Sequence, residues 1–183
     1  MRIFDNDIDK IARLQENIGR PLHTSSINPE YLAYQLTSAD VLIAAVHSKL
    51  GRSPIIVTNE MVGKMKSNSV IIDLTIDQGG CIESSRLTTH QKPTFTYEGV
   101  THYCIPNVAS KVARTASQAL SNILVGIILM IGEESQDIKR LLYLKKGLRG
   151  AVYTFNGYTT NAFLAKRFEQ KFTSLDLILT SDQ

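Results

Sequence analysis

The chain has 183 residues, of which 43% are apolar and 20% are charged. This composition is ordinary for a globular protein with room for one domain or one and a half, and it excludes intrinsic disorder and collagen-like repeats. Lys and Arg number 20 against 17 Asp and Glu, which leaves a formal charge of +3. Because this charge is spread along the chain, no basic patch indicates a nucleic-acid partner.

Two cysteines and one apolar run bear on where the protein works. Cys81 and Cys104 occur in a chain without an apolar N-terminal signal. That combination favours a reducing, cytoplasmic compartment and free thiols over a disulfide scaffold. The longest apolar run, 123–131, is interrupted only by Gly126 and is far shorter than the ~20 residues of a membrane-spanning helix. We therefore expect a buried helix there and no membrane partner.

Short apolar runs alternate with amphipathic segments in the first half of the chain. Strands are expected at 2–4, 22–25, 41–46 and 70–74. Caps of the intervening helices are Asn6 with Asp7, Asn28 before Pro29, and Thr58, with Gly19 just past the end of the first helix. The runs 41–46 and 70–74 lack polar alternation, as expected of strands covered on both faces. This order predicts an α/β fold with a doubly wound parallel sheet.

The second half of the chain begins irregularly and then becomes helical. After Asp77-Gln78-Gly79-Gly80, an irregular stretch containing Pro93 leads to the apolar run 103–105. Helices are expected over 115–131 and near 137–144. The turn pair Asn156-Gly157 between 152–155 and Tyr158 favours a hairpin. Thr160 is expected to cap the last helix.

Three strand ends carry residues suited to binding a ligand. Ligands of such sheets bind outside the carboxyl ends of the strands, which here are Phe4-Asp5, 74–80 and 105–108. Asp5 occupies the place of a carboxylate that accepts hydrogen bonds from ribose hydroxyls and repels a 2′-phosphate, which favours NAD over NADP. A simple helix cap explains Asp5 equally well.

The segment Asp77-Gln78-Gly79-Gly80 carries more information. Two glycines after an acid let the backbone approach a ligand, and the acid can handle protons beside a nicotinamide ring. A capping aspartate in a turn explains the same residues, and spacing alone favours that reading. Asn107 can offer its amide to a cofactor carboxamide or stabilise a turn.

Two familiar signatures are missing from the sequence. None of the four histidines pairs with an acid or cysteine at metal-ligand spacing, so no metal site is expected. No two glycines are separated by a single residue, so the glycine fingerprint that cradles a dinucleotide pyrophosphate is absent.

Six segments together resemble the alanine dehydrogenase family: 39–43, 57–62, 69–83, 88–90, 102–107 and 114–117. The match runs in order from Met1 to about Ile131, and a weaker one continues through Tyr153, Gly157 and Thr160-Asn161. The related transhydrogenase alpha subunits typically carry Ala-Ala-Glu in place of Thr75-Ile76-Asp77 and usually lack the His-Tyr-Cys run at 102–104. The chain is therefore more similar to the dehydrogenases.

The resemblance implies an enzyme that interconverts L-alanine and pyruvate plus ammonia, with NAD as hydride acceptor, in a homo-oligomer that is often a hexamer. Asp77 would be the catalytic acid, which stabilises the cationic amine or imine and helps to relay protons. Asp5 would hold the adenosine ribose, with Lys10 close by. The remaining cofactor contacts implied are Val46, His47, Leu74, Thr75, Ile76, Asp77, Arg86, Ile105, Pro106, Asn107 and Val108.

The chain also departs from the family pattern. Family members carry a catalytic domain, a first strand and a glycine-rich turn before the segment that Met1 matches, and Ile27 stands where the family often has a serine. We therefore expect a C-terminal fragment: a truncated Rossmann-type sheet over 1–114, then a connecting helix and the end of a catalytic domain over 115–183. Alone it should not oxidise L-alanine. The alternatives are a non-catalytic nucleotide-binding remnant and a transhydrogenase alpha-type subunit.

Overall fold

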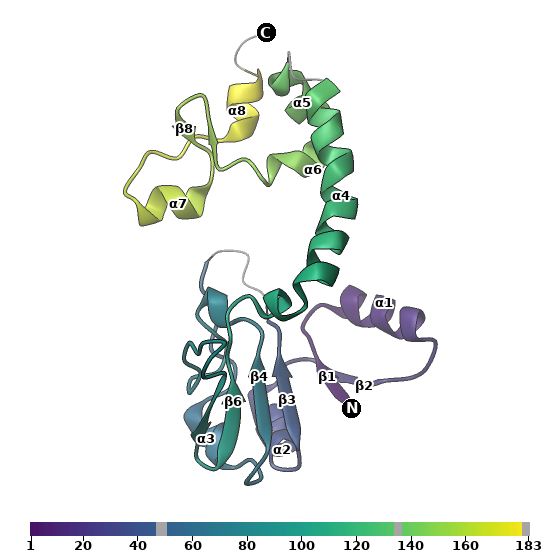
Figure 1. Ribbon diagram of the computed structural model, residues 1–183, viewed down its shortest axis with the longest axis vertical. Coiled ribbons are helices and arrows are strands. Elements are labelled where there is room, and N and C mark those ends of the chain that lie inside the picture. Colours follow the sequence, from purple (N-terminus) through teal and green to yellow (C-terminus); the bar gives the residue numbers. More distant parts are fainter. Residues whose placement is uncertain (47–50, 134–136, 181–183) are drawn as a thin grey trace. The chain divides into compact units, whose positions relative to one another are not determined.

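The computed structural model describes residues 1–46, 51–133 and 137–180, and the chain divides into two compact units, Met1–Val108 and Ala109–Gln183. The first unit holds two sheets (Figure 1). One pairs β1 (Arg2–Phe4) with β2 (His23–Ser25) in parallel. The other has the order β3-β4-β6-β5, with β3 at Val41–Ala44, β4 at Val70–Asp73, β5 at Thr94–Tyr97 and β6 at Val100–Tyr103.

The predicted parallel pairing is confirmed, but the expected strands divide between two sheets, and one strand is added. β3, β4 and β6 run parallel, with Ile71 of β4 opposite both Leu42 of β3 and His102 of β6. β5 lies in the stretch that we expected to be irregular, and that expectation was wrong. It pairs antiparallel with β6 through a two-residue turn, Glu98-Gly99, in which both residues have positive φ (48° and 76°). Paired positive φ values are typical of the hairpin turns that match strand twist.

The helices of the first unit begin at side-chain caps. Asp7 caps α1 (Ile8–Ile18), and Gly19 ends it in the left-handed conformation at φ 67°. Asn28 caps α2 (Pro29–Leu36), and Thr58 caps α3 (Asn59–Gly63). Asn6 does not cap α1 as expected, because its Oδ1 accepts a hydrogen bond from the backbone amide of Ile27 at 2.9 Å. That bond ties the end of β1 to the segment after β2.

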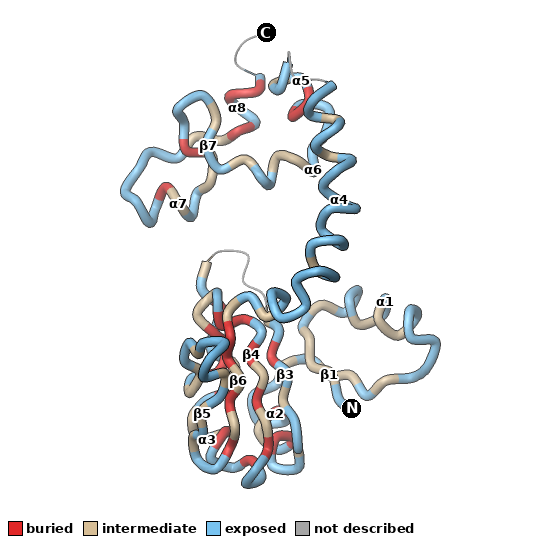
Figure 2. The backbone as a smooth tube through the Cα atoms, viewed as in Figure 1, coloured by how far each residue is buried: buried red, intermediate tan, exposed pale blue. Residues whose placement is uncertain are grey.

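The core of the first unit lies on one face of the four-stranded sheet (Figure 2). Side chains from α2, α3, the strands and the connecting segments form it: Leu32, Leu36, Ala44, Val57, Val62, Met65, Ile71, Cys81, Ile82 and Val100. The expectation that β3 is covered on both faces was wrong, since Val41 and Ile43 are 54% and 61% exposed. Parallel strands are joined by right-handed crossovers. When successive strands are added on the same side of the sheet, these crossovers place their helices on one face of it, and the other face of β3 stays open for another element to cover.

The second unit is mostly helical. It contains α4 (Ala113–Glu133), α5 (Ile138–Leu144), α6 (Lys146–Arg149), β7 (Thr154–Phe155), β8 (Tyr158–Thr159), α7 (Ala162–Arg167) and α8 (Leu175–Thr180). The predicted hairpin is confirmed, with positive φ at Asn156 and Gly157. Asn161, not Thr160, caps α7, since its side chain accepts from the Leu164 amide at 3.0 Å. The Thr160 hydroxyl donates to the Val152 carbonyl at 2.8 Å instead.

A small core and one arginine hold α5, α6 and α8 together. Leu142, Leu175 and Leu179 are buried against one another. The Arg149 guanidinium donates to the Leu142 and Tyr143 carbonyls at 2.8 and 2.7 Å and pairs with Asp176 at 2.6 Å. Cationic side chains are favourable beside the last carbonyls of a helix, so Arg149 stabilises the end of α5.

Helix α4 is apolar but exposed. None of its residues is buried, and Leu120, Ile123, Ile128 and Leu129 are each at least 59% exposed (Figure 2). The expectation of a buried helix was therefore wrong. The helical stretch Val108–Glu133, which includes the 3₁₀ turn η2 (Val108–Val112), is long and apolar enough by length and composition alone to cross a membrane, with a mean hydropathy of 1.6 over 18 of its residues. Core helices of soluble proteins have the same length and composition.

The exposed side chains of α4 predict self-association of the chain in aqueous buffer, because a large exposed apolar patch gains free energy by leaving water. We expect sedimentation velocity to show a mass that rises with concentration. The double substitution Ile123→Gln and Ile128→Gln should lower that mass, while Ser121→Gln on the same helix should not. A wild-type chain that stays monomeric throughout, or a Ser121→Gln variant that behaves like the double variant, would contradict this expectation.

Candidate functional site

The carboxyl ends of β3, β4 and β6 lie at one edge of the sheet, because these strands are parallel. The segments that follow β3 and β4 are joined at that edge through Ser53, a buried residue. Its hydroxyl donates to the Val46 carbonyl at 3.1 Å, and its amide donates to the Gln78 carbonyl at 2.9 Å. The structure therefore brings Val46 and the segment around Asp77 together. His47 lies outside the described residues.

Asp77 lies in a tight 3₁₀ turn, η1 (Ile76–Gln78), directly after β4. Its side chain is exposed. The Gln78 and Gly80 amides donate to the Thr75 carbonyl at 2.9 and 3.0 Å, and the Gly79 amide donates to the Ile76 carbonyl at 3.0 Å. These hydrogen bonds join the backbone that follows Asp77 to the backbone that precedes it, and so close the turn. The turn presents the Asp77 carboxylate at the sheet edge.

Both glycines after Asp77 have positive φ, 93° at Gly79 and 74° at Gly80. The space beside each is filled by the chain itself. A Cβ at Gly79 would lie 2.7 Å from Cγ of Arg52, and one at Gly80 would lie 2.8 Å from Oδ2 of Asp73. The sequence led us to expect that the backbone at these glycines approaches a ligand. In the structure it instead approaches the side chains of Arg52 and Asp73.

The residues predicted to line the nicotinamide half differ in depth. Thr75, Ile76 and Ile105 are buried, so at the surface they can offer only backbone groups. Asn107 is exposed and adopts a positive φ of 52°. The side chains at the surface are those of Leu74, Asp77 and Asn107, with Pro106 and Val108 half-buried. This edge combines an apolar side chain, a carboxylate and an amide.

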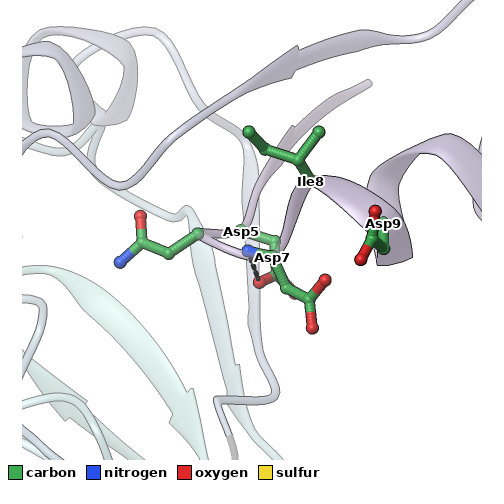
Figure 3. A pocket seen from close by; sticks show the side chains of 5 residues that line it. Asp5, Asp7, Ile8 and Asp9 are labelled. Carbon is green, nitrogen blue, oxygen red and sulfur yellow. Dashed lines mark hydrogen bonds between the residues drawn. The ribbon is translucent and has the colours of Figure 1, made fainter.

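Asp5 follows β1 at the mouth of an open depression of about 710 Å³, shown in Figure 3. The depression is lined by Asp5, Asn6, Asp7, Ile8 and Asp9. The Asp5 carboxylate accepts the Asp7 amide at 2.9 Å through Oδ1, so Asp5 does stabilise the helix entry. Lys10 lies beside it, with Nζ 3.5 Å from Asp7 Oδ2. The hydrogen bond from the Lys10 amide lowers the pKa of Asp7.

Arg86 lies on the other side of β6 from β3. Its guanidinium carbon is 4.2 Å from the centre of the Phe95 ring on β5, a cation–π contact that holds an exposed side chain in place. The preceding Ser85 accepts a weak hydrogen bond from Cys104 Sγ at 3.6 Å. Arg86 is therefore fixed next to the segment that follows β6.

A buried polar cluster lies beneath this edge. Asp73 is 1% exposed and His102 is fully buried, and the thiols of Cys81 and Cys104 are buried as well. The prediction of free thiols is confirmed. Burial raises the pKa of both thiols, and the charge of Asp73 raises it further, so both stay protonated. Reasoning from the sequence missed Asp73, although an acid in the apolar run 70–74 signals a carboxylate that the sheet buries.

The tautomer of His102 follows from its two hydrogen bonds. Nδ1 lies 3.1 Å from the Val100 carbonyl, which can only accept, so Nδ1 carries the proton. Nε2 then accepts from the Ser84 hydroxyl at 2.8 Å. The ring also stacks on Phe95 with centroids 4.8 Å apart. Burial lowers the pKa of His102, and the positive charge of Arg86 lowers it further, against an opposing effect of Asp73.

Within residues 1–46, 51–133 and 137–180, no group of three His, Cys, Asp or Glu side chains is arranged to hold a metal ion.

Comparison with known proteins finds relatives that match nearly the whole chain. The family described as alanine dehydrogenase/PNT, C-terminal domain, matches residues 1–162. The alanine dehydrogenase of Bacillus subtilis is 34% identical over 181 residues, which cover 98% of this chain and 47% of that protein. Alanine dehydrogenase 2 of Staphylococcus aureus is 33% identical over 175 residues, 95% of this chain and 46% of that protein. The chain thus spans about half the length of the curated relatives it matches.

Solved structures give the same result for the fold. An L-alanine dehydrogenase superposes with a TM-score of 0.78 at 28% identity, covering 92% of this chain and 46% of that one. A transhydrogenase from Sinorhizobium meliloti superposes with a TM-score of 0.60 at 24% identity, covering 71% and 37%. The predicted α/β fold with a Rossmann-type parallel sheet is confirmed.

The buried His102 predicts how stability depends on pH. Its pKa in the folded chain lies below the usual 6.5, so the folded state binds fewer protons than the unfolded state once the pH falls below that value. The contribution of His102 to stability is present above pH 6.5 and is lost as the pH falls through the lowered folded-state pKa. Chemical unfolding between about pH 7.5 and about pH 5 measures this loss.

The matched variants are His102→Gln, which cannot titrate, and His23→Gln, which removes an exposed histidine. We expect His102→Gln to flatten the acid-side fall in the free energy of unfolding and His23→Gln to leave its slope unchanged. A slope equal to wild type in His102→Gln would show that other groups cause the fall.

Proposed function

The chain belongs to the alanine dehydrogenase/PNT C-terminal domain family, and on that premise we propose that it forms the NAD-binding part of an enzyme that interconverts L-alanine and pyruvate plus ammonia. The observation that carries the proposal is the gathering of Val46, the Asp77 turn and 105–108 at one edge of the parallel sheet. This is where open α/β sheets bind ligands. The family match confirms the resemblance seen in the sequence.

The described residues fit a nicotinamide nucleotide in both of its halves. Asp5 would hold the adenosine ribose, because one of its oxygens accepts the Asp7 amide and the other remains to accept ribose hydroxyls at an open depression. Leu74 to Asp77 and Ile105 to Val108 would line the nicotinamide half with an apolar side chain, an exposed amide and backbone groups. Arg86, held on Phe95, would contact the dinucleotide. When bound, the nicotinamide ring supplies hydride acceptance and return.

The charge at the adenosine end favours NAD over NADP. Asp5, Asp7 and Asp9 line the same depression, and the nearby Lys10 side chain is directed to Asp7. Three carboxylates at one opening repel the 2′-phosphate of NADP, whereas the ribose hydroxyls of NAD can donate hydrogen bonds to Asp5.

Asp77 would serve the chemical step. Its carboxylate is exposed on a turn that backbone hydrogen bonds hold rigid, so it can stabilise a cationic amine or imine and pass a proton to or from it. Positioning of the substrate can supply ~7–11 kcal/mol of the barrier. We place the residues that hold the substrate carboxylate in the part of the relatives that this chain does not match. The exposed apolar side chains of α4 support a homo-oligomer in which other protein covers them.

Asp5→Asn tests the nucleotide site on the chain itself. Asparagine keeps an oxygen that can accept the Asp7 amide, so the entry to α1 stays intact while the charge is lost. We expect wild type to bind NADH more tightly than NADPH in fluorescence titrations. Because hydrogen bonds to charged groups are the stronger ones, Asp5→Asn should weaken NADH binding by about tenfold and reduce the preference for NADH.

Asp9→Asn is the matched control, because it removes the same charge from the same depression. It should change NADH binding much less than Asp5→Asn. Equal effects of the two substitutions would mean that only net charge matters, and a chain that binds neither nucleotide would contradict the proposal. NADH binding without alanine-dependent NADH formation by the enzyme that contains the chain would identify a non-catalytic nucleotide binder.

A further inference from the structure

Asp73, the last residue of β4, is a buried carboxylate with an incomplete set of partners. It is 1% exposed. Its Oδ1 accepts two hydrogen bonds from Thr75, from the amide at 3.0 Å and from the hydroxyl at 2.7 Å. Its Oδ2 has no hydrogen-bond partner among the described residues. Burying such an oxygen costs free energy, so an asparagine or an apolar residue would suit the core of the sheet better.

Thr75 connects Asp73 to the turn that carries Asp77. Thr75 stands at the cap position of η1, yet its side chain makes no capping bond there, because its hydroxyl donates to Asp73 instead. The Thr75 carbonyl accepts the amides of Gln78 and Gly80. The backbone that follows Asp77 is thus fastened to Thr75, which precedes it, and Thr75 is fastened to Asp73.

Gly80 completes the arrangement from the other end of the turn. Its backbone passes so close to Asp73 that a Cβ there would lie 2.8 Å from Oδ2, and 3.3 Å from both Ile76 Cδ1 and Ser85 Cβ. With φ at 74°, Gly80 lies where side chains are disfavoured in any case. The second oxygen of Asp73 is therefore covered by the returning chain.

We propose that Asp73 is a positioning residue: together with Thr75 and Gly80, as the Asp73 clamp, it fixes the turn that holds the Asp77 carboxylate at the sheet edge. This inference rests on the proposed function, in which Asp77 acts on the substrate. A rigid carboxylate matters there, because small displacements of a reacting group cost much of the advantage that positioning gives. The buried charge of Asp73 is explained by this role.

Thr75→Val tests the clamp directly. Valine keeps the shape of threonine but loses the hydroxyl that donates to Asp73. We expect amide hydrogen exchange of Gln78 and Gly80 to speed up by roughly tenfold, the effect of losing about one hydrogen bond, while exchange of Ile72 in β4 stays as in wild type. Thr75→Ser, which restores the hydroxyl, should restore slow exchange.

Two further variants sharpen this experiment. Thr88→Val is the matched control, because the Thr88 hydroxyl also donates to a single oxygen, the Pro93 carbonyl, at 3.1 Å. It should leave the Asp77 turn unchanged. Asp73→Ala combined with Thr75→Val should speed exchange no more than Asp73→Ala alone, because Asp73→Ala already removes the oxygen that accepts the Thr75 hydroxyl. Unchanged exchange of Gln78 and Gly80 in Thr75→Val, or the same increase in Thr88→Val, overturns the clamp.

Turnover of the alanine-oxidising enzyme that contains the chain separates positioning from stability. We expect Thr75→Val to lower kcat by roughly tenfold at an unchanged KM for NAD, Thr75→Ser to restore it, and Asp77→Asn to lose most turnover with NAD affinity nearly unchanged. A kcat that is equal in Thr75→Val and wild type overturns the positioning role. Absence of alanine oxidation in wild type refutes the proposed function instead, and the exchange experiment still decides whether the clamp exists.

Discussion

Parallel pairing of β3, β4 and β6 is the constraint on which the rest of the first unit depends. Parallel strands need crossover connections, and they bring their carboxyl ends to one edge. Ser53 joins the segment after β3 to the segment after β4 at that edge, and the Leu74 amide extends the β3 ladder by donating to the Ala44 carbonyl at 2.9 Å. The candidate site is therefore a consequence of strand direction, with individual side chains supplying its chemistry.

The polar residues under this edge are kept neutral or tied down. The backbone carbonyl of Val100 and the hydroxyl of Ser84 hold His102 in one neutral tautomer, and burial keeps both thiols protonated. Asp73 is the buried carboxylate among the described core residues, and its contacts lead to the turn of Asp77. An apolar residue in place of Asp73 would make the core more stable. The fold thus gives up some stability at the place where the site needs a rigid loop.

Local sequence patterns predicted the parts of the fold that local physics decides. Apolar runs predicted β3 and β4, and the capping residues Asp7, Asn28 and Thr58 predicted where three helices begin. β5 was missed because only the pair Glu98-Gly99 signals its hairpin, and glutamate rarely adopts positive φ. Exposure of α4 depends on contacts distant in the sequence, or on protein that covers the helix, so no short-range pattern shows it. The roles of Asp5 and Asp77 came from family resemblance, since spacing alone left a ribose contact and a helix cap equally open for Asp5 and favoured a turn for Asp77.

The most direct measurement of the central claim, that the carboxyl edge of the sheet binds a nicotinamide nucleotide, is an amide chemical-shift map of the ¹⁵N-labelled chain titrated with NADH. The account predicts perturbed amides after the carboxyl ends of the strands, at Asp5, Val46, Leu74, Asp77 and Asn107. It also predicts unperturbed amides before the opposite ends, at Asp40, Ser69 and Gly99. Perturbations centred on Asp40, Ser69 and Gly99, or along α4, would contradict it.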